Sequence, residues 1–232
     1  MLKHFLAIET STDACTIAIC YQNQIEFFYE IAPKQHSELL LPQIDLLLEK
    51  LNIRLIDLDA IIVGEGPGSF TGVRMGLSVA QGLCLATGLK AYQIPTLLAV
   101  ALSGLPYPLS SQKSVIVAID ARMGEVYAQR FEVQNALLVP TGKIELGRFE
   151  KVLSRLVQPS DTALYGVGNG FAVYAEDLEP FVAQFERIDG ACFPHAGHFS
   201  QHLLQHPTYA RSVESLSELL PVYVRDKVAS HL

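Results

Sequence analysis

The chain has 232 residues, of which 50% are hydrophobic and 18% are charged. This composition predicts a compact globular protein with a sizeable core and excludes an intrinsically disordered chain. The net charge is −7 and no cluster of Lys and Arg is present, so this chain alone is a poor candidate for binding a nucleic acid.

The lengths of the apolar runs and the spacing of the cysteines are not typical of a targeting signal, a membrane span or a disulfide framework. No apolar run reaches the roughly 18 residues of a membrane span, and Glu9 interrupts the short apolar start that a signal peptide would need. The four cysteines form no C-x-x-C pair, which favours reduced thiols over a disulfide or metal framework. We therefore expect a cytoplasmic protein that does not associate with membranes.

The first third of the chain predicts alternating strands and helices. Polar turns separate three β-prone runs, at 5–8, 16–21 and 25–29, as in a hairpin or meander. A helix over about 37–51 follows, with Ser37 as its N-cap, and Pro42 suits this helix only near its start or at a kink. A buried strand over 58–63, a glycine-rich loop and a second helix over about 72–87 complete this region.

The opening pattern returns in the second half. Ala118-Ile119-Asp120 matches Ala7-Ile8-Glu9, and each is followed by a small-residue turn, a second strand and a QN turn. A repeated hairpin predicts two related α/β lobes. We place these lobes at 1–103 and 104–232, and leave open whether the last segment packs back on the first lobe. Further helices are predicted at 142–157, 175–185, 195–205 and 213–220.

The loop GEGPGSFTGVRMG, residues 64–76, contains five glycines between two apolar runs. It is not a P-loop, because no lysine occurs between Lys50 and Lys90, and it is not a dinucleotide fingerprint, because Ser69 stands where the third glycine belongs. The loop still joins a strand to the N-terminus of a helix, where free backbone N–H groups can bind an anion. The alternatives are that another stretch of this chain, or another protein, approaches the glycines.

Both helices predicted near the front of the chain are apolar around most of their circumference. In the second helix, the clearly polar positions are Arg74, Ser78 and Gln81, while Leu and Ile cover most of the first. A helix on one sheet needs an apolar face only somewhat wider than about 100°. Two explanations remain open: the helices bury each other and cover the sheet, or they also contact another protein.

Three histidines, His195, His198 and His202, are spaced for one helical face, as zinc ligands would be. No Glu on the same helix and no second carboxylate accompany them, so a solvated helix is favoured over a metal site.

Four carboxylates lie at the mouths of the two repeated hairpins: Glu9, Asp13, Asp120 and Glu125. They would hold Mg²⁺ with a nucleotide if the lobes face each other, or they cap turns by accepting backbone N–H bonds. No catalytic set emerges, because no Ser–His–Asp arrangement is visible and Ser69 is not in a G-x-S-x-G elbow.

Five strings of the chain carry a resemblance to a known family. They are LAIETSTDACTIAI, HSELLLP, GEGPGSFTGVRMGLSVAQGL, AIDARMGEVYAQ and PVYVRDKVA, and they run from the first strand to the last ten residues. Together they resemble the bacterial TsaB (YeaZ) family, and the first 130 residues match best. The resemblance implies the two-lobed α/β fold of actin, sugar kinases and chaperone ATPases, called ASKHA, with a reduced second lobe.

The resemblance also implies a function. The resemblance implies a scaffold subunit that is required but has no catalytic activity of its own. Such a subunit pairs with TsaD, the related catalytic subunit, and works with the ATPase TsaE. The complex transfers a threonylcarbamoyl group, supplied as threonylcarbamoyl-adenylate, to the adenosine beside the anticodon of tRNAs that read codons starting with A. We expect no cofactor on this chain alone, ATP or ADP and a metal ion on the partner subunits, and tRNA contact only through the complex.

The metal ligands of the catalytic relative can be compared with this chain. In that relative, a similar strand, GPG turn and helix are followed by an H-x-x-x-H pair that ligates the metal. The matching region here contains Thr96, Leu97 and Ala101, and no histidine occurs from Tyr92 to Arg122. The resemblance therefore implies a chain that has kept the fold and lost the metal site.

In the family, two helices of each partner form a four-helix bundle, which here implies the helices at about 37–51 and 72–87. The expected contacts are Leu40, Ile44, Leu47, Met75, Val79 and Gly82, with Arg74 and Ser78 at the polar rim. The same helices are expected to form a homodimer when TsaD is absent. The alternative function is an autonomous ASKHA-type ATPase or small-molecule kinase; a peptidase would lack both metal ligands and a nucleophile.

Overall fold

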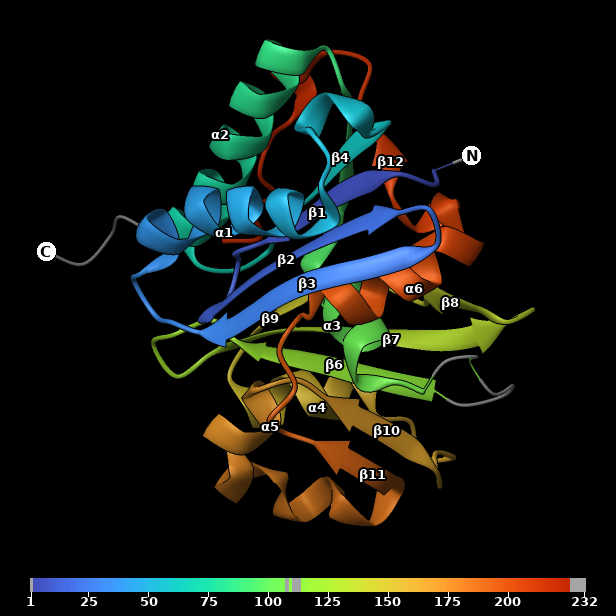
Figure 1. The fold of residues 1–232 in the computed structure, drawn as a ribbon. Coiled ribbons are helices and arrows are strands. Elements are labelled where there is room, and N and C mark those ends of the chain that lie inside the picture. The colour runs from blue at the N-terminus through green and yellow to red at the C-terminus, as the bar shows by residue number, and fades with distance from the viewer. Residues whose placement is uncertain (1, 107–108, 110–113, 226–232) are drawn as a thin grey trace, which may run out of the picture. The chain divides into compact units, whose positions relative to one another are not determined.

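The computed structural model describes residues 2–106, 109 and 114–225. The chain divides into two compact units (Figure 1): unit 1 holds Met1–Tyr107 and Phe193–Pro221, and unit 2 holds Pro108–Cys192 and Val222–Leu232. The boundary expected from the sequence, between 103 and 104, differs from this division because residues 193–221 pack with the first unit. Residues 107–108 and 110–113, in the segment rich in Ser and Pro between the two predicted lobes, and the residues beyond Arg225 lie outside the described residues.

Unit 1 is built around a six-stranded sheet in the order β12-β5-β4-β1-β2-β3. Its strands are β1 (Phe5–Glu9), β2 (Ala14–Tyr21), β3 (Gln24–Ile31), β4 (Ala60–Gly64), β5 (Lys90–Ile94) and β12 (Arg211–Ser212). Its α-helices are α1 (His36–Leu51), α2 (Phe70–Thr87), α3 (Thr96–Gly104) and α6 (Ala196–Gln205). Strands β1, β2 and β3 form the predicted antiparallel meander, and β4 and β5 add on in parallel beside β1.

Helices cover both faces of this sheet. Neighbouring residues of a strand point to opposite faces, and β3 shows the division: Phe28 packs against the core that contains α1 and α2 residues, whereas the ring of Phe27 contacts His195 at the start of α6. Helix α3 packs against α6. The α1 and α2 side chains in the core include Leu40, Ile44 and Leu77.

Unit 2 repeats this plan with the strand order β11-β10-β6-β7-β8, and β9 pairs with β7. Its elements are β6 (Ser114–Asp120), β7 (Val126–Gln134), β8 (Leu137–Pro140), β9 (Glu145–Gly147), α4 (Phe149–Leu156), β10 (Leu164–Val167), α5 (Gly170–Val173) and β11 (Phe185–Asp189). Strand β6 pairs antiparallel with β7 and parallel with β10, as β1 pairs with β2 and β4. The duplication expected from the repeated hairpin is confirmed, and with it the α/β class with two related units.

Several predicted helices of the second half are shorter or of another type. Residues 175–185 form a 3₁₀ helix, Ala175–Gln184, that contains Pro180, a residue that cannot donate an α-helical bond. Helix α4 begins only at Phe149, because β9 precedes it and ends at Gly147 with φ of 154°. Residues 213–220 hold only a short 3₁₀ turn. Helix α1 begins before Ser37, with no side-chain cap.

Among the described helices, none combines the length and the hydropathy that a bilayer-crossing segment requires.

Candidate functional site

The glycine-rich loop between β4 and α2 is approached by the chain's own β1–β2 turn. A Cβ placed on Gly68 would lie 2.2 Å from the carbonyl oxygen of Ser11, and one on Gly72 would lie 2.1 Å from that of Thr10. Both distances are far below van der Waals contact, so only glycine fits. This settles which of the three partners considered for the loop lies against these glycines: a second stretch of the same chain.

The first amides of α2 are also bonded within the chain. The backbone N–H of Ser69, the N-cap residue, donates to the carbonyl oxygen of Ser11 at 2.7 Å. The N–H of Gly72 donates to the Ser69 hydroxyl at 3.3 Å. Two of the groups that a phosphate would need at this helix end are therefore already hydrogen-bonded.

Glu9 ends β1 beneath this loop and is fully buried. Its carboxylate accepts hydrogen bonds from the Ser11 N–H at 2.6 Å and from the Thr96 hydroxyl at 2.8 Å. A Cβ on Gly64 would lie 2.0 Å from one of its oxygens. Burial raises the pKa of Glu9, although these hydrogen bonds oppose the shift. The group holds the turn, the loop and the start of α3 together and is closed to solvent, so it is not an accessible base.

Glu9 predicts a pH dependence of stability. Because its pKa is raised in the folded state, the folded chain binds this proton more tightly than the unfolded chain, so the stability contributed by this group falls as pH rises through the folded pKa. In Glu9→Gln, the amide can still accept from Ser11 and donate to Thr96, and this titration is removed. Urea unfolding between about pH 5 and about pH 8 should show the variant gaining stability relative to wild type as pH rises. Parallel curves would show that Glu9 does not titrate as inferred.

The corresponding turn of unit 2 uses its acids differently. Asp120 accepts from the Tyr174 hydroxyl at 2.8 Å and from the Arg122 N–H at 2.9 Å, and Glu125 pairs with Arg225 at 2.6 Å. Burial, followed by the bond to Asp120, raises the pKa of Tyr174 to about 12. Asp120 thus accepts a backbone N–H bond, as the turn-capping explanation expects, whereas Glu125 forms an ion pair with the Arg225 side chain instead.

The histidine that precedes α6, His195, and the two within it, His198 and His202, are not placed to form a metal site. His195 stacks on His198 with ring centroids 4.0 Å apart and on Tyr29 at 4.6 Å. His202 is only 2% exposed, so the prediction of a solvated helix is wrong at this position, because α6 packs on the sheet and on α3. Burial lowers the pKa of His195 and of His202 to about 4. Within the described part of the chain, no group of three or more His, Cys, Asp or Glu is placed to hold a metal ion.

Helices α1 and α2 carry most of the residues predicted to contact a partner. Leu40, Ile44 and Leu47 are buried in the unit's own core, so their predicted place on an exposed contact surface is corrected. These residues recur at i, i+4 and i+7, which is the stripe of α1 that faces the sheet.

The predicted α2 residues lie closer to the surface. Arg74, Ser78 and Gly82 are exposed and recur every four residues on one side of α2, while Met75 and Val79 are half-buried beside them. A Cβ on Gly82 would meet nothing within 4 Å.

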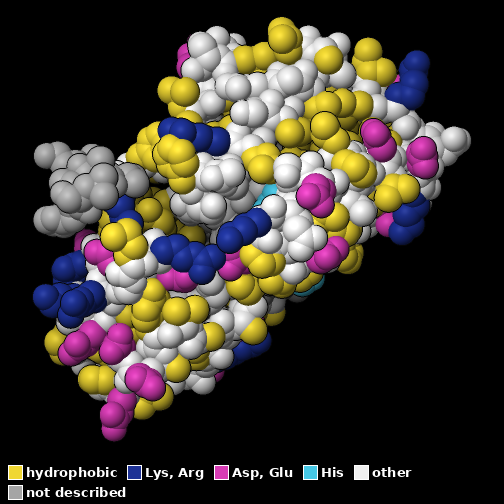
Figure 2. Space-filling view, turned by 90° about the vertical axis from the view of Figure 1, so that its left-hand side faces the viewer, with side chains coloured by type: hydrophobic (Ala, Val, Ile, Leu, Met, Phe, Trp, Pro, Cys, Tyr) yellow, Lys and Arg dark blue, Asp and Glu magenta, His cyan; other side chains and the backbone are white. Residues whose placement is uncertain are grey.

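Large apolar side chains that the sequence reasoning did not select are exposed on the same two helices: Leu41, Leu46, Phe70 and Leu85, with exposed fractions between 48% and 79%. Figure 2 shows hydrophobic side chains exposed over the face that it presents, interspersed with polar and charged ones. The four side chains on α1 and α2 are the apolar positions that remain once the core-facing stripe is assigned.

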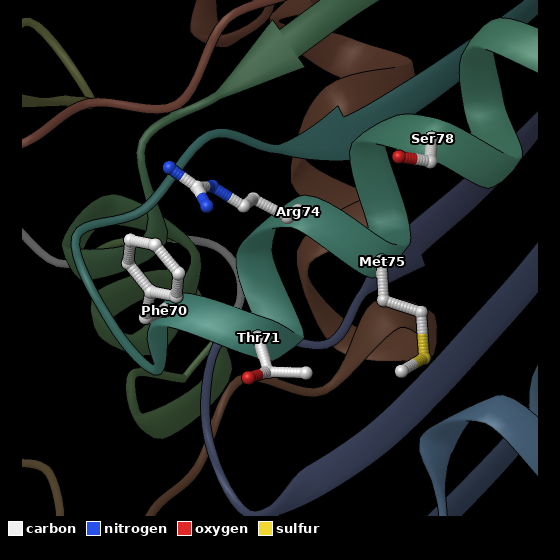
Figure 3. A pocket seen from close by; sticks show the side chains of 5 residues that line it. All are labelled: Phe70, Thr71, Arg74, Met75 and Ser78. Carbon is white, nitrogen blue, oxygen red and sulfur yellow. The ribbon is translucent and has the colours of Figure 1, made fainter.

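A shallow pocket of about 390 Å³ lies on the first half of α2, lined by Phe70, Thr71, Arg74, Met75 and Ser78. Figure 3 shows Arg74 lying over Phe70, with Thr71 and Met75 on the other side of the helix and Ser78 one turn further on. The Arg74 guanidinium carbon is 3.6 Å from the centre of the Phe70 ring, in cation–π contact. Helices α1 and α2 therefore expose large apolar side chains and the Arg74 guanidinium, next to the exposed acids of α1. We call the set of these apolar side chains and the residues of the α2 pocket and its side of the helix the α1/α2 face. It comprises Leu41, Leu46, Phe70, Thr71, Arg74, Met75, Ser78, Gly82 and Leu85.

Known proteins resemble this chain over almost its full length. The tRNA threonylcarbamoyladenosine biosynthesis protein TsaB of Haemophilus influenzae is 32% identical over 233 aligned residues, which cover 96% of this chain and 94% of that protein. The chain belongs to the TsaB family. The model of a related family, described as TsaD: tRNA N6-adenosine threonylcarbamoyltransferase, matches residues 26–215 of this TsaB-family chain.

Solved structures agree with this TsaB assignment. YeaZ from Pseudomonas aeruginosa is 29% identical, has a TM-score of 0.78 and covers 96% of this chain and all of that one. A second Pseudomonas aeruginosa structure, described as an uncharacterized protein with similarity to peptidase YeaZ, is 31% identical with a TM-score of 0.82. The predicted TsaB (YeaZ) resemblance is confirmed.

Proposed function

We propose that this chain is a scaffold subunit in the biosynthesis of tRNA threonylcarbamoyladenosine. It pairs with a TsaD-like catalytic subunit, works with a TsaE-like ATPase in the cytoplasm, and performs no chemistry of its own. The names of its relatives support the pathway, and the match to the TsaD family model supports a partner of related fold. The substrate is the adenosine beside the anticodon of tRNAs that read codons starting with A.

The observation that carries the scaffold role is the α1/α2 face. It exposes large apolar side chains on two helices that contact each other, and exposed apolar surface is typical of interaction sites. Ser78 and Gly82 are small, so a partner helix can approach α2 closely along their side. We propose that two TsaD helices complete a four-helix bundle here, and that two copies of this chain pair through the same face when TsaD is absent.

Support for a non-catalytic role comes from the interior of unit 1. The loop that would receive a phosphate lies against the β1–β2 turn, and Glu9 is buried and hydrogen-bonded. We propose that the chain alone binds neither nucleotide nor metal, and that ATP or ADP and the metal ion belong to the partner subunits.

The test is reconstitution. The chain should form a stable complex with the TsaD subunit of the same organism on size-exclusion chromatography. The tRNA should be modified only when this chain, TsaD, TsaE and threonylcarbamoyl-adenylate are combined. The chain alone should show no steady ATP turnover. Turnover that persists through repeated purification, without complex formation, would favour the autonomous ATPase or kinase instead.

A further inference from the structure

Gln81 is a polar residue of α2 whose side chain binds a segment near the other end of the chain. Its amide nitrogen donates to the backbone carbonyl oxygens of Leu216 at 3.1 Å and of Leu219 at 3.2 Å. The sequence groups Gln81 with Arg74 and Ser78 as polar positions of this helix, but Gln81 does not line the surface pocket as they do. Its contact with a distant segment therefore calls for an explanation of its own.

The segment that Gln81 binds is residues 211–220, which we call the strap. The strap pairs with β5 through β12, and the Gln93 side chain of β5 donates to the carbonyl oxygen of Leu220 at 2.8 Å. The Leu219 side chain is only 1% exposed and lies in the core that also contains Leu77 of α2. The strap is therefore held by the sheet and by α2 together.

Helix α2 is tied to distant segments at two places. At its start, the Thr10 hydroxyl donates to the carbonyl oxygen of Gly72 at 2.8 Å, which joins the first turn of the helix to the β1–β2 turn. In its second half, Gln81 joins the helix to the strap. Ser78 and Leu85 of the α1/α2 face come three residues before and four after Gln81, so they are its neighbours on the helix surface. A shift of this half of α2 would therefore move residues of the face.

We infer that Gln81 and the strap position the second half of α2 so that a TsaD helix can pack along it. The inference rests on the proposed function, and it adds to that function residues that act without touching the partner. A helix that is already held in its bound position binds more tightly, because association does not have to order it. Loss of the strap bonds should therefore lower the affinity for TsaD while the α1/α2 face keeps all its side chains.

Calorimetric titration with the TsaD subunit tests the inference. Gln81→Met keeps the length and neutrality of the side chain but removes both N–H bonds, and it should weaken binding by about 5- to 20-fold. Gln81→Lys keeps N–H donors at the end of a long side chain and should restore most of the affinity. Gln129→Met is the matched control, because the Gln129 amide donates to the carbonyl oxygen of Gly142 at 2.8 Å in unit 2. This control should bind TsaD as wild type does.

Leu219→Ala separates positioning by the strap from a direct contact between Gln81 and the partner. It loosens the strap from the core and should lower the affinity as Gln81→Met does. The double variant should bind no more weakly than the weaker single variant, because both changes act through the strap. Circular dichroism checks that each variant is folded.

Hydrogen exchange of the free chain gives a readout that does not involve TsaD. In Gln81→Met, the amides of residues 80–87 should exchange faster than in wild type, because the strap no longer holds this half of α2. The amides of residues 73–77 should exchange at the wild-type rate, since the β1–β2 turn still holds the start of the helix.

Three results would contradict the inference while the scaffold role stands. The first is that Gln81→Met binds TsaD like wild type. The second is that Gln81→Met weakens binding while a folded Leu219→Ala does not, which would assign Gln81 a direct contact. The third is unchanged hydrogen exchange in the second half of α2. If wild type itself does not bind TsaD, the proposed function fails, and the inference fails with it.

Discussion

Gly82→Trp should lower the affinity for the TsaD subunit by at least about 100-fold, or about 3 kcal/mol, and leave the fold of this chain intact. Gly82 is exposed in the middle of α2, in line with Arg74 and Ser78, and a side chain built there meets nothing within 4 Å. An indole would therefore fit the free chain but would occupy the space along which a partner helix approaches. Titration calorimetry gives the affinity, and circular dichroism with thermal unfolding checks the fold.

Gly142→Trp is the matched control. Gly142 also has no atom within 4 Å of its built Cβ, and it lies in unit 2 outside α1 and α2. It should bind TsaD like wild type. Equal loss of binding in both variants would mean that added bulk acts nonspecifically, and unfolding of Gly82→Trp alone would assign the glycine a packing role within this chain.

Gly72→Ala should destabilise the chain by about 3 kcal/mol, the second large effect. Its Cβ would lie 2.1 Å from the Thr10 carbonyl oxygen, which belongs to a backbone turn and cannot swing away as a side chain can. The turn or the start of α2 must shift, and the buried bond from the Thr10 hydroxyl to the Gly72 carbonyl oxygen, 2.8 Å long, weakens with it. Urea unfolding monitored by circular dichroism measures the loss.

Gly82→Ala is the control for helix propensity. It makes the same chemical change in the same helix, but the added methyl group meets open space. Alanine loses less backbone entropy than glycine on folding, so this variant should gain about 0.5–1 kcal/mol. Two substitutions of one type thus have opposite expected signs. If Gly72→Ala were as stable as Gly82→Ala, the close approach of the β1–β2 turn would be refuted.

Much of the fold could be read from residue patterns. The three strands of the meander, the two apolar helices and the repeat beginning near Val115 depend on local periodicity, which survives in the structure as β1–β3, α1, α2 and β6–β8. The helix predicted over 175–185 was wrong in type, because Pro180 interrupts its hydrogen bonding. The sequence did not predict that residues 193–221 belong to unit 1, because this depends on contacts between segments far apart in the chain.

The candidate site was predicted in part. Periodicity identified α1 and α2 as too apolar for one sheet, but it could not say which leucines the sheet would cover. Leu40 and Ile44 are buried, while Leu41 and Leu46 are exposed on the same helix. Burial depends on how a helix is rotated against its neighbours, and residues one position apart differ by about 100° around the axis. The sequence analysis did not select Phe70, because the helix was predicted to begin at about residue 72 and Phe70 is the first residue of α2.

Residue patterns within single segments were therefore enough to predict the alternating strands, the apolar helices and the duplicated hairpin. They were also enough to indicate the family. Tertiary structure decided what the glycines of 64–76 are for, which faces of α1 and α2 remain uncovered, and that Arg74 lies over Phe70. The physical reason is that close backbone approach and side-chain exposure both depend on which segments are brought into contact by folding. A pattern within one segment shows that a face is apolar, and only the packed chain shows whether something already covers it.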